Sequence, residues 1–177
     1  MDGNTDGSQP AKRYRLTILG LGNLLFKDEG FGVHFVRAFQ GKYRLPDDVA
    51  VIDGGTLGYM LMDDICQTEH LVVVDTVRAD DAPGSIYRFT PEAIPLRVHY
   101  NVSAHEVEFL DVLSKAAMLG EAPETVIIAV VPEDIVGTGI ELTPSVQASL
   151  PKVEALVKEE LHRMGVAVDE MHPEQVG

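Results

Sequence analysis

Hydrophobic and polar positions follow two different periods along this chain, and their alternation predicts strands and helices in turn. Apolar runs of strand length occur at residues 14–22, 49–53, 70–76, 85–89 and 125–131. The run HLVVVDT at 70–76 is nearly all apolar and β-branched, as expected for a strand buried on both faces. The run SIYRF at 85–89 alternates apolar and polar residues, which favours a less buried, antiparallel strand.

Between these runs, apolar residues recur at the spacings of three and four that indicate helices. We expect helices over 29–41, after Thr56, over 104–118 and from Thr143-Pro144. Their inward faces are predicted to carry, in order, Phe31, Phe35, Ala38 and Phe39; Leu57, Leu61 and Ile65; Val107, Leu110, Leu113 and Ala117; and Val146, Leu150, Val153, Val157 and Leu161. Pro151 is out of place inside the last stripe. Strands that alternate with helices predict an α/β fold with a mainly parallel sheet covered on both faces.

The length of 177 residues suits a single domain with its own core. We expect that domain over residues 14–165, between a flexible N-terminal extension at 1–13 and a loose C-terminal tail at 166–177. The longest apolar runs are far shorter than the ~20 residues of a membrane helix, and the polar N-terminus lacks the apolar segment of a secretory signal. The single cysteine, Cys66, excludes an internal disulfide framework and fits a cytoplasmic location.

The net negative charge of the chain excludes some classes of binding partner. The chain has 28 acidic and 14 basic residues, a formal net charge of −14, and its basic residues are scattered rather than clustered. Such a surface repels nucleic acid and anionic lipid, so neither is expected as a partner. The same surface attracts cations.

The glycine-rich segment GLGNLLFKDEGFG, residues 20–32, lies between the first strand and the first helix. A dinucleotide site would need a third glycine where Leu25 stands, and no P-loop lysine follows. The carboxylates of Asp28 and Glu29 would repel a pyrophosphate, so we expect no nucleotide cofactor. Acids in the first turn of a helix stabilise it by ~0.3–1 kcal/mol each through the helix dipole, and helix capping accounts for Asp28.

Four potential metal ligands are predicted at one edge of the sheet. Glu29 follows the first strand, Asp53 and Asp75 end the second and third, and His105 begins the helix after the fourth. The carboxyl ends of parallel strands share an edge, so these side chains are expected to gather there. Bunched carboxylates repel one another unless a divalent cation lies between them or one takes up a proton. Carboxylates with one imidazole suit zinc, nickel, manganese or iron, and ligand type alone does not choose between these metals.

Each of these residues also has a structural explanation when taken singly. Asp75 is a reasonable strand stop, and His105 can bond to backbone at a helix start. Cys66 lies in the apolar segment LMDDICQ and is predicted to be a core residue rather than a nucleophile.

Several motifs together resemble those of the hydrogenase maturation proteases. They are GLGNLLFKDEGFG, DGGT, HLVVVDTV, SAHEVEFLDVL and VVPE followed by LTPSV, and the resemblance extends from about Leu16 to about Leu161. It implies a twisted five-stranded sheet between helices. It also implies an endopeptidase that removes a short C-terminal peptide from the large-subunit precursor of a nickel–iron hydrogenase, after nickel has been inserted.

Carried over by motif, the residues that contact the metal in this family fall on Glu29, Asp75 and His105, and Asp53 matches an acidic position linked with cleavage. The nickel would then belong to the substrate. The candidate catalytic residues are Asp53, Glu29 and Asp75. The metal could polarise the scissile carbonyl or supply hydroxide, or Asp53 could activate a water as general base.

Two positions depart from the family pattern. Glu108 stands where relatives often carry a small residue, and Ala129 stands where glycine is common. Both are expected to lie off the site, so the departures bear on which hydrogenase is the partner.

The sequence is also compatible with two other functions. A non-catalytic nickel carrier or assembly chaperone would use the same acids and histidine to hold free metal. Peptidyl-tRNA hydrolase also carries a GLGN turn, but Leu24-Leu25 follow it here and the negative charge opposes a tRNA partner.

Overall fold

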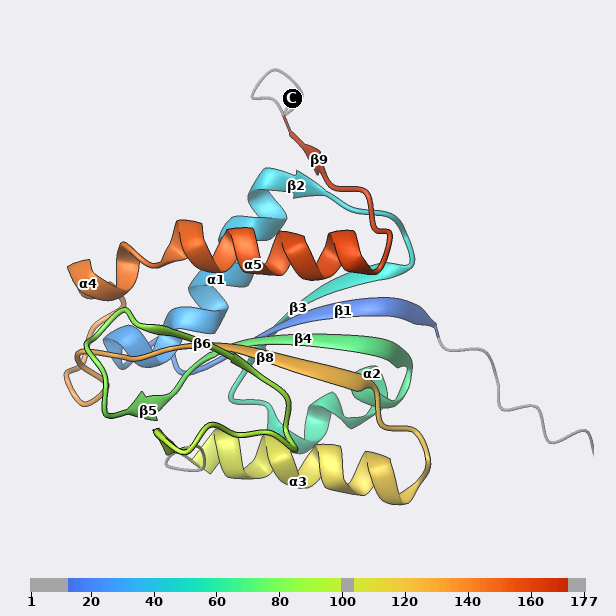
Figure 1. Cartoon of the computed structure of the whole chain (residues 1–177), viewed down its shortest axis with the longest axis horizontal. Coiled ribbons are helices and arrows are strands. Elements are labelled where there is room, and N and C mark those ends of the chain that lie inside the picture. The colour runs from blue at the N-terminus through green and yellow to red at the C-terminus, as the bar shows by residue number, and fades with distance from the viewer. Residues whose placement is uncertain (1–12, 100–103, 172–177) are drawn as a thin grey trace, which may run out of the picture.

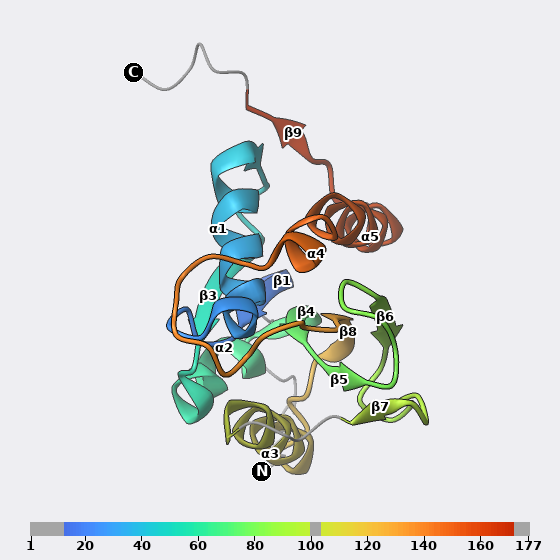
Figure 2. The same cartoon turned by 90° about the vertical axis from the view of Figure 1, so that its left-hand side faces the viewer.

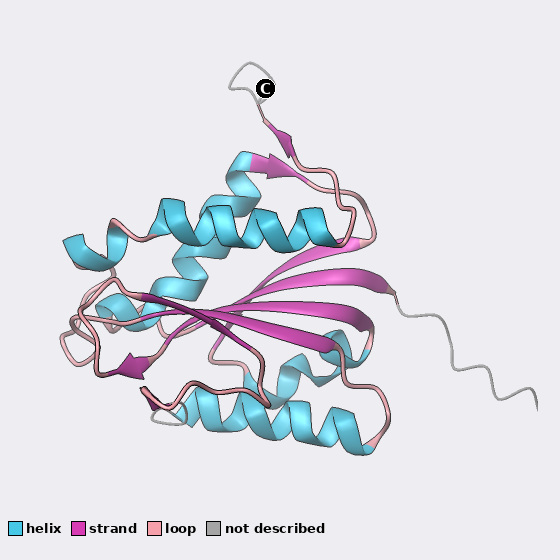
Figure 3. Ribbon diagram, in the orientation of Figure 1, coloured by secondary structure: helices cyan, strands magenta, loops and turns pink. Residues whose placement is uncertain are grey.

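The fold is built on one twisted sheet of five strands. The structure, a computed structural model, describes residues 13–99 and 104–171. The sheet order is β3-β1-β4-β8-β6, with β1 (Tyr14–Leu21), β3 (Val49–Gly55), β4 (Thr68–Thr76), β6 (Ile86–Phe89) and β8 (Glu124–Val130). All neighbours are parallel except β6, which runs antiparallel to β8 (Figures 1 and 3). The predicted single α/β domain with a mainly parallel five-stranded sheet is confirmed.

Helices cover both faces of this sheet (Figure 1). One face carries α1 (Phe31–Lys42), α4 (Pro144–Gln147) and α5 (Leu150–Arg163), and the 3-10 turn η1 (Lys27–Gly30) leads into α1 at the carboxyl edge of the sheet. The other carries η2 (Gly58–Leu61), α2 (Met62–Cys66) and α3 (Ala104–Met118). Two short strand pairs lie outside the sheet, β2 (Tyr43–Arg44) with β9 (Asp169–Glu170) and β5 (Arg78–Ala79) with β7 (Val98–His99).

The central strand β4 shows why both layers form. Val72 and Val74 pack into the core under α1 and α5, whereas Leu71 and Val73 pack into the core under α2 and α3. Each of these side chains is at most 3% exposed. Burial of such a side chain contributes about 1.5–3 kcal/mol, so β4 holds the two helix layers to one sheet.

The inward face of α3 differs from the prediction, although its bounds agree. Leu110 and Leu113 pack toward the core as predicted, but Val107 is 50% exposed and Ala117 is exposed, and Phe109, Val112 and Ala116 are buried in their place. Phe109 is the largest buried side chain of this helix. Turning the helix to bury that ring moves positions 107 and 117 toward solvent.

Pro151 does not interrupt a helix, because the expected helix after Thr143 is two helices. Thr143 is extended, with ψ of 153°, and Pro144 opens α4 as predicted. The chain then restarts as α5 at Leu150, which places Pro151 in the first turn. The missing N–H of proline leaves no hydrogen bond unmade in that position.

The predicted loose tail at 166–177 is wrong for its first part. Val166 is 5% exposed and belongs to the core under α1 and α5. Strand β9 pairs with β2, and the Met171 amide donates to the Lys42 carbonyl at 2.9 Å. The rest of that tail, and the predicted N-terminal extension apart from Arg13, lie outside the described residues. Within the described ranges, the helices are too short or too polar to cross a membrane.

Candidate functional site

The glycines of the segment 20–32 allow backbone to pack directly on backbone. A Cβ on Gly20 would lie 2.2 Å from the Gly32 carbonyl oxygen, and one on Gly32 would lie 2.1 Å from the Val74 carbonyl oxygen. Gly22 has a φ of +131°, and its Cβ would lie 1.8 Å from the Glu29 carbonyl oxygen. Side chains at these positions would force the layers apart. The glycines therefore bring η1 and the start of α1 onto the ends of β1 and β4.

Glu29 lies in η1, at the carboxyl edge of the sheet. Its amide donates to the Phe26 carbonyl at 3.0 Å, and its carbonyl accepts from the Asn23 amide at 3.1 Å. The side chain is half-buried, and η1 packs against β4. The fold thus sets Glu29 beside the strand that carries Asp75.

Asp75 is fully buried near the end of β4. Residues alternate between the faces of a strand, so Asp75 faces the α2 and α3 layer, as Val73 does. Its Oδ1 accepts the Thr76 amide at 2.7 Å. Its register partner on β8 is Ala129, which is fully buried. The expectation that Ala129 lies off the site is therefore wrong, because partners on neighbouring parallel strands share a face.

His105 is the second residue of α3, the helix that covers the face toward which Asp75 points. Its side chain lies outside the described part of the structure. Glu108, one turn later, contacts Gly58, where a Cβ would lie 1.9 Å from Glu108 Oε2. Glu108 thus joins the first turns of α3 to η2. Among the side chains that the structure describes, no group of three His, Cys, Asp or Glu is placed to hold a metal ion.

Asp53 stands apart from the other predicted site residues. Its backbone is in register with Gly20 at the same edge, but its carboxylate lies on the α1 side of the sheet. Arg37 of α1 holds it there, through Nε at 2.8 Å and Nη2 at 2.7 Å. The expected gathering of four side chains does not include Asp53, because β1 separates β3 from β4 and the strand alternation turns it to the opposite face.

Asp28 has a structural role that the sequence did not predict, since it binds the segment between β8 and α4. It is fully buried and caps neither η1 nor α1. Its Oδ2 accepts the amides of Glu133 and Asp134 and the hydroxyl of Thr143 at 2.9 Å each, and its Oδ1 accepts the Thr143 amide at 2.7 Å. The interpretation of Asp28 as a helix cap is therefore wrong.

Lys27 also binds the segment between β8 and α4 that contains Glu133, Asp134 and Thr143. It has a positive φ of 43°, its amide donates to the Gly139 carbonyl at 2.7 Å, and its Nζ lies 2.5 Å from Asp134 Oδ2. The Lys27 ammonium, with the amides of Gly137 and Val136, lowers the pKa of Asp134 to about 2. Asp134 therefore stays ionised and holds the loop at neutral pH.

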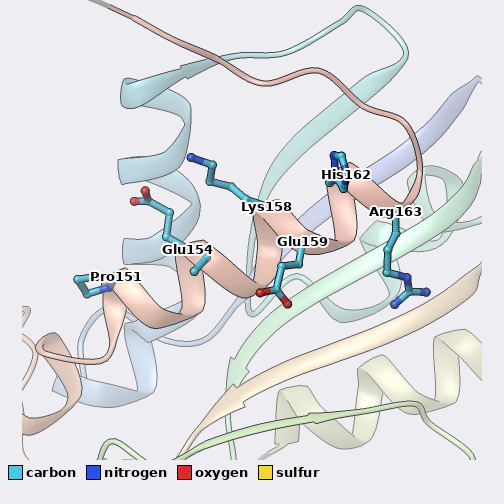
Figure 4. Close-up of a pocket in the computed structure, with 7 residues that line it drawn as sticks. Pro151, Glu154, Lys158, Glu159, His162 and Arg163 are labelled. Carbon is cyan, nitrogen blue, oxygen red and sulfur yellow. The ribbon is translucent and has the colours of Figure 1, made fainter.

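Other concavities lie away from these residues. One, of about 590 Å³, runs along the outer face of α5 and is lined by Pro151, Glu154, Ala155, Lys158, Glu159, His162 and Arg163 (Figure 4). Glu154 on this helix accepts from the Tyr43 hydroxyl at 2.6 Å and from Lys42 at 2.9 Å, which braces α5 against the end of α1 and β2. Cys66 is half-buried and packs against the core under α3, in line with its predicted core role.

Comparison with known proteins gives a consistent result. A family described as "Hydrogenase maturation protease" matches residues 33–160. The "Hydrogenase 2 maturation protease" of Escherichia coli is 36% identical over 154 residues, covering 86% of this chain and 93% of the relative. The hydrogenase expression/formation protein HoxM of Azotobacter vinelandii is 38% identical over 153 residues, covering 85% and 74%.

Solved structures show the same relation. The hydrogenase maturating endopeptidase HybD from Escherichia coli superposes with a TM-score of 0.82 at 35% identity, covering 88% of this chain and 97% of that one. The [NiFe] hydrogenase maturation protease HybD from Thermococcus kodakarensis gives a TM-score of 0.67 at 27% identity, covering 82% and 98%. Sequence and fold agree over nearly the whole described chain, and this protein belongs to the hydrogenase maturation protease family, whose members are endopeptidases.

Proposed function

We propose that this protein removes a C-terminal peptide from the large-subunit precursor of a nickel–iron hydrogenase, and that it recognises the substrate's nickel through Glu29, Asp75 and His105. Membership of the protease family supports the reaction. The nickel is substrate-borne in this proposal, and the reaction is placed in the cytoplasm. Family membership leaves no reason to retain the peptidyl-tRNA hydrolase alternative.

The observation that carries the recognition step is the position of Asp75. Its fully buried carboxylate lies on the face covered by α3, whose second residue is His105, and beside η1, which holds Glu29. A buried carboxylate favours a cation within reach, because desolvation makes its charge costly on its own. Three protein ligands would leave other coordination positions of the nickel to the precursor.

Nickel bound in this way would act first by positioning. A precursor that carries the metal would bring its adjacent peptide bond to the carboxyl edge of the sheet. Cleavage would then take place within the bound complex rather than in a bimolecular encounter, which lowers the entropic part of the barrier. The bound metal supplies Lewis-acid chemistry at the scissile carbonyl or at a water. A precursor without nickel offers nothing for Glu29 and Asp75 to ligate.

Asp53 takes a separate role in this proposal. Its carboxylate lies on the α1 side with Arg37, across the edge from Asp75. From there it could act as general base only on a water that lies over the end of β1, taking its proton as the water attacks the scissile carbonyl. Asp53→Asn should therefore lower the rate of cleavage without changing its dependence on nickel.

The test is trimming of a purified precursor, with and without nickel, followed by mass spectrometry of the large subunit. We expect trimming only of the nickel-loaded precursor, and we expect Glu29→Gln to abolish it because one ligand is lost. Glu69→Gln is the matched control, since this exposed residue lies on the amino half of β4. Equal trimming with and without nickel would rule out recognition through the metal.

The same purified protein and precursor can be used to distinguish a protease from a nickel carrier. A carrier holds free nickel tightly in equilibrium dialysis and leaves the precursor uncut. Tight binding of free nickel together with an intact precursor would favour the carrier and overturn the proposed reaction.

A further inference from the structure

The connection between β8 and α4, residues 131–143, crosses the carboxyl edge of the sheet (Figure 2). We call it the pinned loop, because the glycine turn holds it at several points. Asp28 accepts four hydrogen bonds from it, and Lys27 pairs with Asp134. A backbone bridge joins Phe26 to Gly139, and the Gly139 amide donates to the Leu25 carbonyl at 2.9 Å. The loop is thus fixed to the turn that carries Glu29.

This fixed unit presents aliphatic side chains to solvent. Leu25 is 65% exposed, Val136 79% and Ile140 64%, and we call these three the aliphatic rim. Leu25 precedes the bridge between Phe26 and Gly139, and Ile140 follows it. Large apolar side chains that are exposed together on a fixed loop are typical of a binding surface.

The rim continues into a pocket of about 590 Å³. Its lining comes from α1, the pinned loop, the end of α4 and the start of α5: His34, Ala38, Ile140, Glu141, Leu142, Gln147 and Leu150. The Nε2 atom of His34 is buried and has no hydrogen-bond partner among the described residues. The pocket combines aliphatic side chains with the polar groups of Glu141 and Gln147, which suits a peptide segment that brings both apolar side chains and backbone polar groups.

We infer that the aliphatic rim and this pocket bind an extended aliphatic segment of the hydrogenase precursor next to its nickel. The inference rests on the proposed function. Leu25 lies four residues before Glu29 in the same glycine turn, so a precursor whose metal meets Glu29 would pass close to the rim. The pinned loop contributes Glu133, Asp134 and Glu141 to a protein of net charge −14, which selects against acidic residues in that segment.

The experiment compares two double variants in the trimming assay with nickel-loaded precursor. Leu25→Ser/Ile140→Ser removes two rim side chains. Met118→Ser/Leu119→Ser is the matched control, because Met118 at the C-terminus of α3 and Leu119 just after it are 85% and 66% exposed. We expect the rim variant to raise KM at least about tenfold with kcat within twofold of the wild type, since two buried aliphatic contacts are lost from binding alone. The control should match the wild type in both constants.

Any other result contradicts either the docking surface or the proposed protease function. An unchanged KM in the rim variant overturns the docking surface while the proposed function stands. A wild type that leaves nickel-loaded precursor intact overturns both. If the rim variant changes only the sedimentation of the protein from dimer to monomer, the surface joins two copies of this chain. Val136→Ser gives a second measurement should the double variant not fold, because this side chain is 79% exposed.

Discussion

Asp28 shows how much one buried carboxylate can organise. It accepts three backbone amides and one hydroxyl from residues more than 100 positions away in the chain. Hydrogen bonds to a charged acceptor are stronger than those between neutral groups, and here they compensate a carboxylate with no exposure. The neighbouring Glu29 is thereby set on a turn that cannot move independently of the pinned loop.

Replacement of Asp28 by Asn should cost about 2–4 kcal/mol of unfolding free energy, because an amide group would face N–H donors. Chemical denaturation measures this loss, and hydrogen exchange should localise it to the amides of Glu133, Asp134 and Thr143. Asp47→Asn, at an exposed position, should change stability by less than about 0.5 kcal/mol. A variant as stable as the wild type would show that Asp28 does not hold the loop.

Asp134 provides a prediction about pH. Its pKa is lowered from 3.8 to about 2 in the folded protein, so its contribution to stability is complete above about pH 4 and is lost as pH falls toward 2. The difference in unfolding free energy between wild type and Asp134→Asn should therefore shrink over that interval. Urea titrations at several pH values measure it, and a difference that stays constant from pH 4 to pH 2 would contradict the assignment.

At the scale of elements, the close approach of α1 to the sheet depends on missing Cβ atoms. The start of the helix lies on the carbonyl oxygens of Leu21 and Val74, and Gly32 is the residue between them. This approach brings η1 to the end of β4, where Asp75 lies. The glycine turn thus packs η1, which carries Glu29, against the strand that carries Asp75.

Two glycines of α1, Gly32 and Gly41, test whether this close packing requires glycine. Gly32→Ala should destabilise the protein by at least about 2 kcal/mol, because the new Cβ would lie 2.1 Å from the Val74 carbonyl oxygen. Gly41→Ala should stabilise it by up to about 1 kcal/mol, because no atom lies within 4 Å and alanine favours helix. Thermal unfolding of the two variants checks the pair, and shifts of equal sign would refute the packing argument.

At the scale of the whole molecule, the C-terminal segment closes the α1 and α5 layer. Truncation after Gly165 should lower the unfolding free energy by about 2–3 kcal/mol, because it removes buried Val166 and the pairing of β9 with β2. Truncation after Met171 keeps all of these contacts and serves as the control. Calorimetry on both proteins measures the difference, and equal melting temperatures would show that residues 166–171 contribute little.

The sequence by itself determined the order and type of the main elements. Apolar runs of strand length and helical stripes depend on local periodicity, and a central strand such as 70–76 must be apolar on both faces because helices cover both. The antiparallel edge strand at 86–89 and the start of α4 at Thr143-Pro144 followed from the same local rules. The motifs around Glu29, Asp75 and His105 also identified the family, since they are short and contiguous.

Only the tertiary structure decided which side chains meet. Asp53 and Asp75 both end strands, yet they point to opposite faces because of strand alternation and the order β3-β1-β4. The orientation of α3 was set by the volume of Phe109, and Ala129 was brought beside Asp75 by the register of β8. The role of Asp28 depends on donors more than 100 residues away, and a local pattern contains no information about such distant partners.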